Sequence, residues 1–369
     1  MCMSKYANTL YYGPKSWTFN HLRLLNYVNG QHQSIIQKHA DGRRIGIINY
    51  WLLEGEQLDM HNISAFCEQC DVIFFVSEEV LNRLDTPLFP EPYPIEQLFD
   101  MLDQYNVWYI GFSGNELFRN KSNAYTTPWF TKSPLYIEQH IEHRYNKKSY
   151  IWNCLLGKNK AHRTKIWHHI VDNNHIYKTY FGHDSLRSYS NTEFESAEHL
   201  DVLLRQDVRN NLLDTFGGDG KVNTELGPVP FSHVVPTELY DASHFDLVSE
   251  TVHNKLAINE PFITEKTAKP LATGRYFVWF GVENTVEYLQ QYGFDFTDYY
   301  TDYDKYSEER VRLGMLIEHV NNITTESQVK HIYNVTHKNR MHNKDVYWKL
   351  RHTFNEDINA FVLRALGVE

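Results

Sequence analysis

Apolar runs of five or six residues alternate with amphipathic stretches along the first part of the chain. Strand-like runs occur at 45–50, 72–76 and 107–112, and helix-like stretches occur at 63–70 and 94–104. Short runs rich in isoleucine, valine and aromatic residues are typical of strands that are buried on both faces. Strands that alternate with helices predict a parallel sheet with crossover connections.

The same alternation continues in the second half of the chain. A strand is predicted at 151–154, a helix at 163–173, and further strands at 245–248 and 277–280. The other predicted helices lie between the cap residues Thr264 and Gly274, and at 285–292, 310–322 and 344–366. These elements predict a second parallel sheet.

We therefore expect an α/β protein with two Rossmann-like domains. The chain has 369 residues, and a single hydrophobic core stops growing at about 250–300 residues. The expected N-terminal domain covers 1–145, the second domain covers 146–325, and a helical segment at 326–369 packs back across the first domain.

Composition narrows the classes of function. Hydrophobic residues make up 42% of the chain and aromatic residues 15%, which is enough for a substantial core. The net charge of −10 argues against a globally basic nucleic-acid-binding protein. A local basic run remains at 330–352, where Lys338, Arg340 and Lys344 are candidate nucleic-acid contacts. The alternative interpretation of this run is a solvated charged face.

The cysteines and the N-terminal sequence indicate the cellular compartment of the protein. Four cysteines form no recognisable disulfide framework, which fits a reducing compartment. No window is apolar over the length of a membrane span, and the N-terminus has no apolar signal core. We expect a cytoplasmic protein without membrane association.

Charged and polar residues gather at the ends of the predicted elements around 245–274. Glu250 follows a strand, Thr264 can cap the next helix, and Glu265 and Lys266 lie in its first turn. A helix N-terminus at the carboxyl edge of a parallel sheet attracts anions, because free N–H groups and the helix dipole face the crevice. A lysine adds a mobile charge for a phosphate, and a carboxylate can accept hydrogen bonds from ribose hydroxyls. The arrangement predicts a nucleotide-sugar pocket.

The same segment resembles the donor-binding motif of alpha-1,3-fucosyltransferases. In that family a Phe-Glu-Asn strand end is followed by Tyr-Val/Ile-Thr-Glu-Lys, and here Ser249-Glu250-Thr251 and Ile263-Thr264-Glu265-Lys266 stand at the two positions. Upstream, Tyr150–Cys154 followed by Lys158 and Arg163 resembles the family's strand, loop and arginine segment. The resemblance covers about residues 148–300 and departs from the family at Thr251, where the family has Asn.

The resemblance implies the GT-B architecture, in which two Rossmann-like domains face one another and the C-terminal one binds the donor. Arg163 and Lys266 would bind the diphosphate of a UDP- or GDP-sugar, and Glu265 would bind the ribose. Similar glycosyltransferases occur in large phages and viruses, where such enzymes often modify hydroxymethylated DNA bases or virion glycans. The implied donor-binding residues are Lys158, Arg163, Glu250, Thr264, Glu265 and Lys266.

An inverting glycosyltransferase needs a carboxylate that takes the proton of the acceptor hydroxyl. We expect this base on a loop at the carboxyl edge of the N-terminal sheet. Glu54 and Glu56 follow the first strand-like run, and Glu116 follows the third. Glu54 is favoured because Gly55 lets the backbone turn directly after it. A retaining enzyme would not need this base.

No metal centre is expected. Asp302-Tyr-Asp304 resembles the D-x-D metal signature of GT-A transferases, but that signature should follow a strand inside a nucleotide-binding sheet. Here the triplet lies in a tyrosine-rich loop after the donor motif. The histidines form no set with Asp or Glu at an established ligand spacing.

The predicted function is metal-independent transfer of a sugar from a nucleotide sugar to a hydroxyl acceptor. The acceptor could be 5-hydroxymethylcytosine in phage DNA, which the basic run at 330–352 favours, or a glycan or protein hydroxyl. The alternative from another class is a non-catalytic protein that binds a nucleotide sugar or a polyanion.

Overall fold

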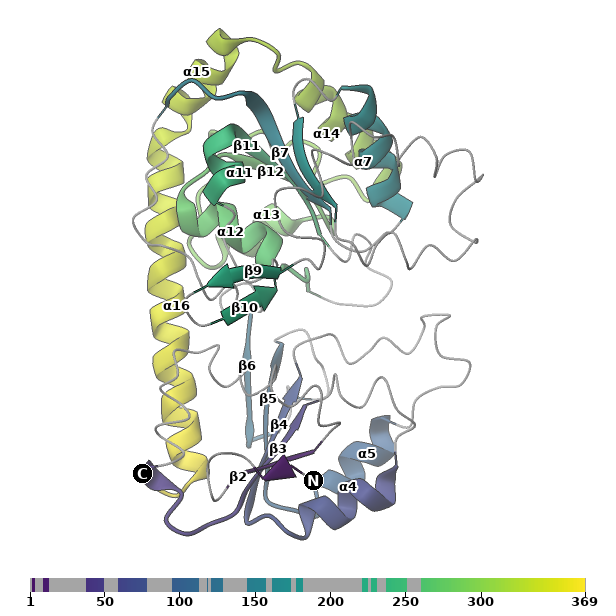
Figure 1. Cartoon of the computed structure of the whole chain (residues 1–369), viewed down its shortest axis with the longest axis vertical. Coiled ribbons are helices and arrows are strands. Elements are labelled where there is room, and N and C mark those ends of the chain that lie inside the picture. The colour runs from purple at the N-terminus through teal and green to yellow at the C-terminus, as the bar shows by residue number, and fades with distance from the viewer. Residues whose placement is uncertain are drawn as a thin grey trace. The chain divides into compact units, whose positions relative to one another are not determined.

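The protein is a mixed α/β molecule with two parallel sheets, which confirms the predicted α/β class (Figure 1). The computed structural model divides the chain into two compact units, one of 1–132, 255–262 and 349–369, the other of 133–254 and 263–348. The described residues are 2–3, 9–12, 38–49, 59–77, 95–112, 118, 121–128, 145–156, 161–173, 177–181, 221–224, 227–230, 237–250 and 260–368.

The first unit contains a sheet of order β1-β2-β3-β4-β5-β6, in which β1 and β2 are antiparallel and the other neighbours are parallel. The predicted strands at 45–50, 72–76 and 107–112 are β3, β4 and β5. Its elements include β1 (Cys2–Met3), β2 (Thr9–Tyr12), β3 (Ile45–Asn49), α4 (Met60–Cys67), β4 (Val72–Ser77), α5 (Ile95–Leu102), β5 (Val107–Phe112) and β6 (Ala124–Thr127).

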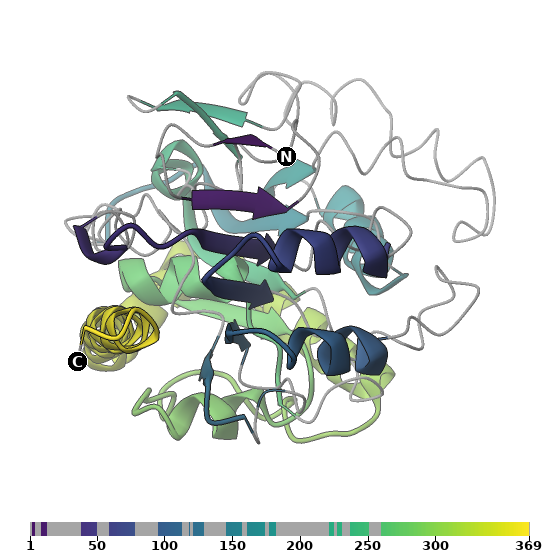
Figure 2. The ribbon, with the colours of Figure 1, turned by 90° about the horizontal axis from the view of Figure 1, so that it is seen from below.

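Helices cover both faces of this sheet. Ile73 and Phe75 of β4 pack into the core formed with α4 and α5. Val72 and Phe74 pack against the C-terminal end of α16 (His337–Ala365). Figures 1 and 2 both show the strands between α4 and α5 on one side and the end of α16 on the other. Burial on both faces explains why β4 is a continuous apolar run.

The second unit contains a four-stranded, fully parallel sheet of order β12-β11-β7-β8. After β8 at one edge, the chain returns to place β11 on the other side of β7, and β12 extends the sheet beyond it. The order of strands therefore reverses between β7 and β11, which is the position where open α/β sheets bind ligands. The four strands are β7 (Tyr150–Leu156), β8 (Tyr177–Phe181), β11 (Ser243–Ser249) and β12 (Phe277–Phe280).

Aromatic and polar contacts hold the neighbouring segments against the two faces of the second sheet. On one face of the sheet, the Tyr276 hydroxyl and Nε2 of His319 on α14 form a hydrogen bond of 3.1 Å. On the other face, Trp279 packs against Phe296, with 5.3 Å between ring centroids. The other elements are α7 (Ala161–Asp172), β9 (Lys221–Thr224), β10 (Gly227–Pro230), α11 (Thr237–Ala242), α12 (Glu265–Thr273), α13 (Thr285–Gln290), α14 (Glu309–Asn321) and α15 (Glu326–Val335).

The C-terminal end of α12 is fixed against α16. Gly274 follows α12 with a φ of 69° and ends it in the left-handed conformation. Arg340 donates to the Gly274 carbonyl oxygen at 2.9 Å, and Trp348 donates to that of Ala272 at 3.0 Å. A Cβ atom at Gly274 would lie 2.6 Å from Cε of Met341.

Replacement of Gly274 by Ala should lower the free energy of unfolding by about 1–2 kcal/mol, because an L-residue is strained at positive φ. Urea denaturation followed by circular dichroism measures the loss. Gly314→Ala is the matched control, since Gly314 lies within α14 with nothing within 4 Å of its added Cβ. The control should gain about 0.5–1 kcal/mol. Equal effects in the two variants would contradict the assignment of strain to Gly274.

Candidate functional site

The candidate site begins at the carboxyl end of β11, where a buried carboxylate organises the start of α12. The Glu250 side chain is 2% exposed. Its Oε1 accepts hydrogen bonds from the Thr264 backbone N–H at 3.1 Å and from the Thr267 hydroxyl at 2.7 Å. Its Oε2 accepts from the Thr264 hydroxyl at 2.6 Å. A negative charge at a helix N-terminus is favourable, because it faces the positive end of the helix dipole.

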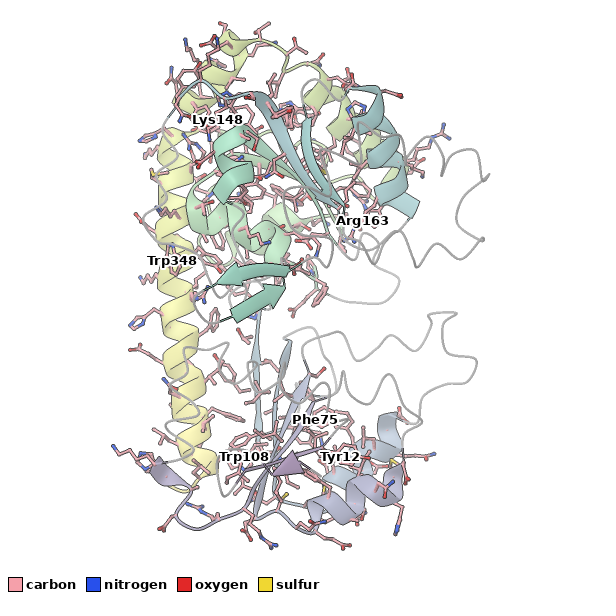
Figure 3. All side chains as sticks on the ribbon, in the orientation of Figure 1. Tyr12, Phe75, Trp108, Lys148, Arg163 and Trp348 are labelled. Atoms are coloured by element: carbon pink, nitrogen blue, oxygen red, sulfur yellow. The ribbon has the colours of Figure 1, made fainter. Side chains whose placement is uncertain are left out.

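The first turn of α7, the helix that follows β7, contacts the backbone at the end of β11. Arg163 donates to the Ser249 carbonyl oxygen at 3.2 Å, and Nε2 of His162 lies 3.0 Å from the Glu250 carbonyl oxygen. Both side chains are buried, and Figure 3 marks Arg163 on α7. Burial lowers the pKa of Arg163, while the carboxylates of Glu250 and Glu265 oppose that shift. The guanidinium therefore lies within electrostatic reach of both acids.

An ion pair lies at the exposed side of the α12 N-terminus. Nζ of Lys266 is 2.6 Å from Oε1 of Glu265 and donates to the Thr264 hydroxyl at 3.1 Å. The side chains of Glu265 and Lys266 are 17% and 15% exposed. Burial alone would raise the pKa of Glu265, but Lys266 and then Lys269 outweigh it and lower that pKa to about 2. Glu265 is therefore ionised at neutral pH.

The structure thus brings together most of the donor-binding residues that the sequence predicted. They come from α7, the end of β11 and the start of α12, and they surround the point where the strand order reverses. Thr267 belongs to the same cluster, and sequence reasoning missed it. The signal was its spacing of three residues from the cap Thr264, which places both on one side of the first turn. The residues brought together are Arg163, Glu250, Thr264, Glu265 and Lys266.

The remaining donor-binding candidate and the candidate bases fall outside the described residues. They are Lys158, Glu54, Glu56 and Glu116.

The three candidate nucleic-acid contacts on α16 differ in exposure. Lys338 is exposed and Lys344 is half-buried. Arg340 is 1% exposed, and its guanidinium donates to the carbonyl oxygens of Gly274 and Tyr333 at 2.9 and 3.1 Å. Arg340 is therefore part of the packing between α12 and α16, and it does not present its charge to a polyanion.

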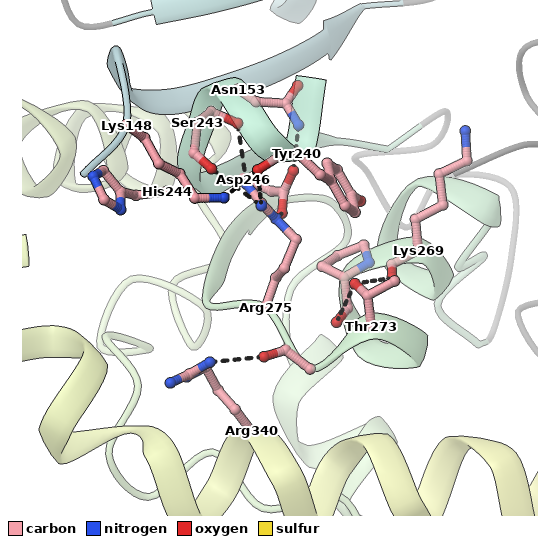
Figure 4. A network of polar contacts seen from close by, with 12 residues as sticks. Lys148, Asn153, Tyr240, Ser243, His244, Asp246, Lys269, Thr273, Arg275 and Arg340 are labelled. Carbon is pink, nitrogen blue, oxygen red and sulfur yellow. Dashed lines mark hydrogen bonds and ion pairs between the residues drawn. The ribbon is translucent and has the colours of Figure 1, made fainter. Parts of the chain in front are cut away.

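A second polar network holds the middle of the sheet (Figure 4). Asp246 of β11 and Arg275 form a buried ion pair, with Nε 2.5 Å from Oδ2. Asn153 of β7 donates to Asp246 at 2.5 Å, and Arg275 donates to the carbonyl oxygens of Tyr240 and Ser243 at 3.1 and 3.2 Å. The network joins β7, β11 and the start of β12, so it fixes the strands whose ends carry the site. Sequence reasoning did not single out this pair.

The D-x-D triplet has a capping role at its second acid. Asp304 is 4% exposed, and its Oδ2 accepts from the Val286 N–H at 2.8 Å. Its backbone carbonyl accepts from the Asn284 N–H at 2.9 Å, so it holds the start of α13. Asp302 is exposed. Among the described residues, no group of three or more His, Cys, Asp or Glu residues could hold a metal ion.

Asp304→Asn should raise the melting temperature above neutral pH. Burial raises the pKa of Asp304 to about 7, whereas its usual value is 3.8. The folded state therefore favours the protonated acid, and the stability it contributes is lost as pH rises from about 4 through about 7. The amide keeps an acceptor for Val286 without titrating.

We expect Asp304→Asn to match the parent chain near pH 4 and to melt about 2–4 °C higher near pH 8, which corresponds to about 1 kcal/mol. Thermal melts across this pH range measure the difference. Asp302→Asn, at the exposed acid, is the control and should leave the profile unchanged. Parallel profiles for the parent chain and Asp304→Asn would contradict the capping assignment.

No family model and no curated protein matches the chain. In the part of the chain that the structure describes, every helix is too short or too polar to cross a membrane. The geometry around Glu250 and the resemblance of the Ile263–Lys266 segment are therefore the grounds on which a function is proposed.

Proposed function

We propose that the protein is a metal-independent glycosyltransferase that transfers a sugar from a nucleotide sugar to a hydroxyl acceptor. The supporting observation is the pair of cations at the point where strand order reverses. Arg163 donates to the Ser249 carbonyl, and Lys266 donates to the Thr264 hydroxyl, which in turn donates to Glu250. Two cations from different elements beside a helix N-terminus suit a phosphate-bearing leaving group. The proposed architecture is GT-B, with the donor on the second unit and the acceptor on the first.

Each charged residue then has a distinct role. Arg163 donates a hydrogen bond to the Ser249 carbonyl oxygen and is attracted by the carboxylates of Glu250 and Glu265, so it serves as a fixed charge for the leaving group. Lys266 is the mobile charge, because its long side chain can rotate from Glu265 to a phosphate. Glu265 is ionised and can accept hydrogen bonds from a ribose. A hydrogen bond that involves a charged group contributes about 1.5–3 kcal/mol.

Glu250 has a structural role in this proposal. Both of its oxygens accept hydrogen bonds from α12 or its cap residue, so its task is to hold the helix N-terminus in place. The proposed base for an inverting reaction is Glu54, with Glu116 as the alternative, on the N-terminal unit. The base would take the acceptor proton as the acceptor oxygen attacks the anomeric carbon and the nucleoside diphosphate departs.

Lys266→Ala should abolish turnover and weaken donor binding at least about tenfold, or about 1.4 kcal/mol. Thermal shift with a panel of UDP- and GDP-sugars measures binding, since a ligand at 100 times its dissociation constant adds about 2.7 kcal/mol to the free energy of unfolding. Release of the nucleoside diphosphate measures turnover. Lys330→Ala is the control. Lys330 is an exposed lysine that pairs with Glu326, four residues before it, and neither residue belongs to the proposed donor site.

The outcomes separate the two classes of function. If a nucleotide sugar binds to the parent chain but no acceptor supports turnover, the protein is a non-catalytic nucleotide-sugar-binding protein. If no nucleotide sugar changes the melting temperature, or if Lys266→Ala behaves like Lys330→Ala, the donor site is wrongly assigned.

For the acceptor, we propose hydroxymethylated duplex DNA, with Lys338 and Lys344 as phosphate contacts. Binding to phosphates releases counterions, so the logarithm of the affinity should fall linearly with the logarithm of salt concentration. Each lysine-to-alanine change should reduce that slope by about 1. Fluorescence anisotropy with labelled DNA at several salt concentrations measures the slope. Lys305→Ala, at another exposed lysine, should leave it unchanged. Absence of DNA binding would favour a glycan or protein acceptor.

A further inference from the structure

Lys269 is a second lysine on α12, the helix that carries the proposed donor site. Lys269 is four residues after Glu265 and three after Lys266 on α12, and it is 2% exposed. Residues three and four apart are neighbours on one side of a helix, and side chains lean toward the helix N-terminus. The stem of Lys269 therefore runs back along the first turn, toward Glu265. In Figure 4 its ammonium group extends away from the Asp246–Arg275 pair.

The charges that act on Lys269 come from two elements. Burial has the largest effect and lowers its pKa to about 7. Glu265 of α12 and Asp246 of β11 oppose this shift, and Lys266 reinforces it. In return, Lys269 helps to lower the pKa of Glu265, after the larger effect of Lys266. Glu265 is thus a carboxylate with two cations on its own helix.

The second cation matters when Lys266 leaves Glu265 to bind a donor. When Lys266 turns toward the donor phosphate, Glu265 loses its 2.6 Å partner. A mostly buried carboxylate that loses its ion-pair partner is destabilised, and it would tend to draw Lys266 back. A second cation one helical turn away removes that conflict.

We propose that Lys269 is a positioning residue that holds the Glu265 carboxylate in place while Lys266 binds the phosphate of the donor. The inference rests on the proposed donor site. Lys269 does not touch the donor in this account, and it acts through Glu265.

Lys269 in this role couples donor binding to protonation, which a merely structural lysine would not do. Near neutral pH, part of the population carries Lys269 without its proton. Departure of Lys266 from Glu265, and arrival of an anionic donor, both favour the charged form of Lys269. Its pKa is therefore higher in the complex than in the free protein, so donor binding takes up protons. By linkage, affinity should fall as pH rises from about 6 to about 8.5.

Titration calorimetry with an intact nucleotide sugar tests this coupling. The intact sugar is used because its pyrophosphate is esterified at both ends and exchanges no proton near neutral pH. Measurements at one pH in two buffers of different ionisation enthalpy give the number of protons taken up, which we expect to lie between zero and one near pH 7.5. This readout requires no variant, so it does not depend on whether a substituted chain folds.

Two variants assign the proton to Lys269. Lys269→Arg keeps a permanent charge, so binding should stay within about threefold of the parent chain at pH 7 and take up no proton. Lys269→Met removes the charge, so affinity should fall at least about tenfold without proton uptake. Lys330→Met, at an exposed lysine, is the control and should retain both affinity and proton uptake.

The outcomes distinguish this inference from the proposed function. If no nucleotide sugar binds to the parent chain, the donor site itself is absent and the inference falls with it. If the parent chain binds a nucleotide sugar without proton uptake, or if Lys269→Met keeps the same affinity and proton uptake, Lys269 has no positioning role while the donor site stands.

Discussion

The buried carboxylate of Glu250 is the interaction on which the candidate site depends. An ionised group inside a protein costs several kcal/mol unless donors surround it. Here the donors are the Thr264 N–H, the Thr264 hydroxyl and the Thr267 hydroxyl, all at the start of α12. The helix therefore has to begin at this point to satisfy the charge. The positions of Glu265 and Lys266 follow from where α12 begins.

Strand β11 connects this carboxylate to the interior of its sheet. Asp246, four residues before Glu250 on the same face of the strand, pairs with Arg275 and accepts from Asn153. Strand β11 thus carries a buried acid that pairs with Arg275, and it is followed by Glu250, whose oxygens accept hydrogen bonds from Thr264 and Thr267. The first fixes neighbouring strands, whereas the second fixes a helix.

Sequence reasoning recovered α12 and the strands β3, β4, β5, β7, β11 and β12, because their signals are local, but it did not predict strands such as β6 and β8. The runs at 72–76 and 277–280 are apolar because helices or loops cover both faces, and Thr264 and Gly274 mark the ends of α12 by their cap geometry. The helix α15 falls inside the helical segment predicted at 326–369, but its start was not located, although Thr325 and Gln328 form a capping box. Contacts across the fold, such as those of Arg340, carry no local signal, so a buried arginine was interpreted as part of a basic surface.

Both ends of α12 are held by charge, and this determines what can move when a ligand binds. Glu250 accepts from its first turn, and Arg340 donates to the Gly274 carbonyl at its last. Each charge faces the end of the helix dipole that favours it. The backbone of α12 is therefore preorganised, and the side chains of its first turn are the parts left to rearrange. If Lys266 changes its partner, the Glu265 carboxylate that it leaves needs another cation on the same helix. Lys269, one turn further along α12, is the lysine proposed for that role.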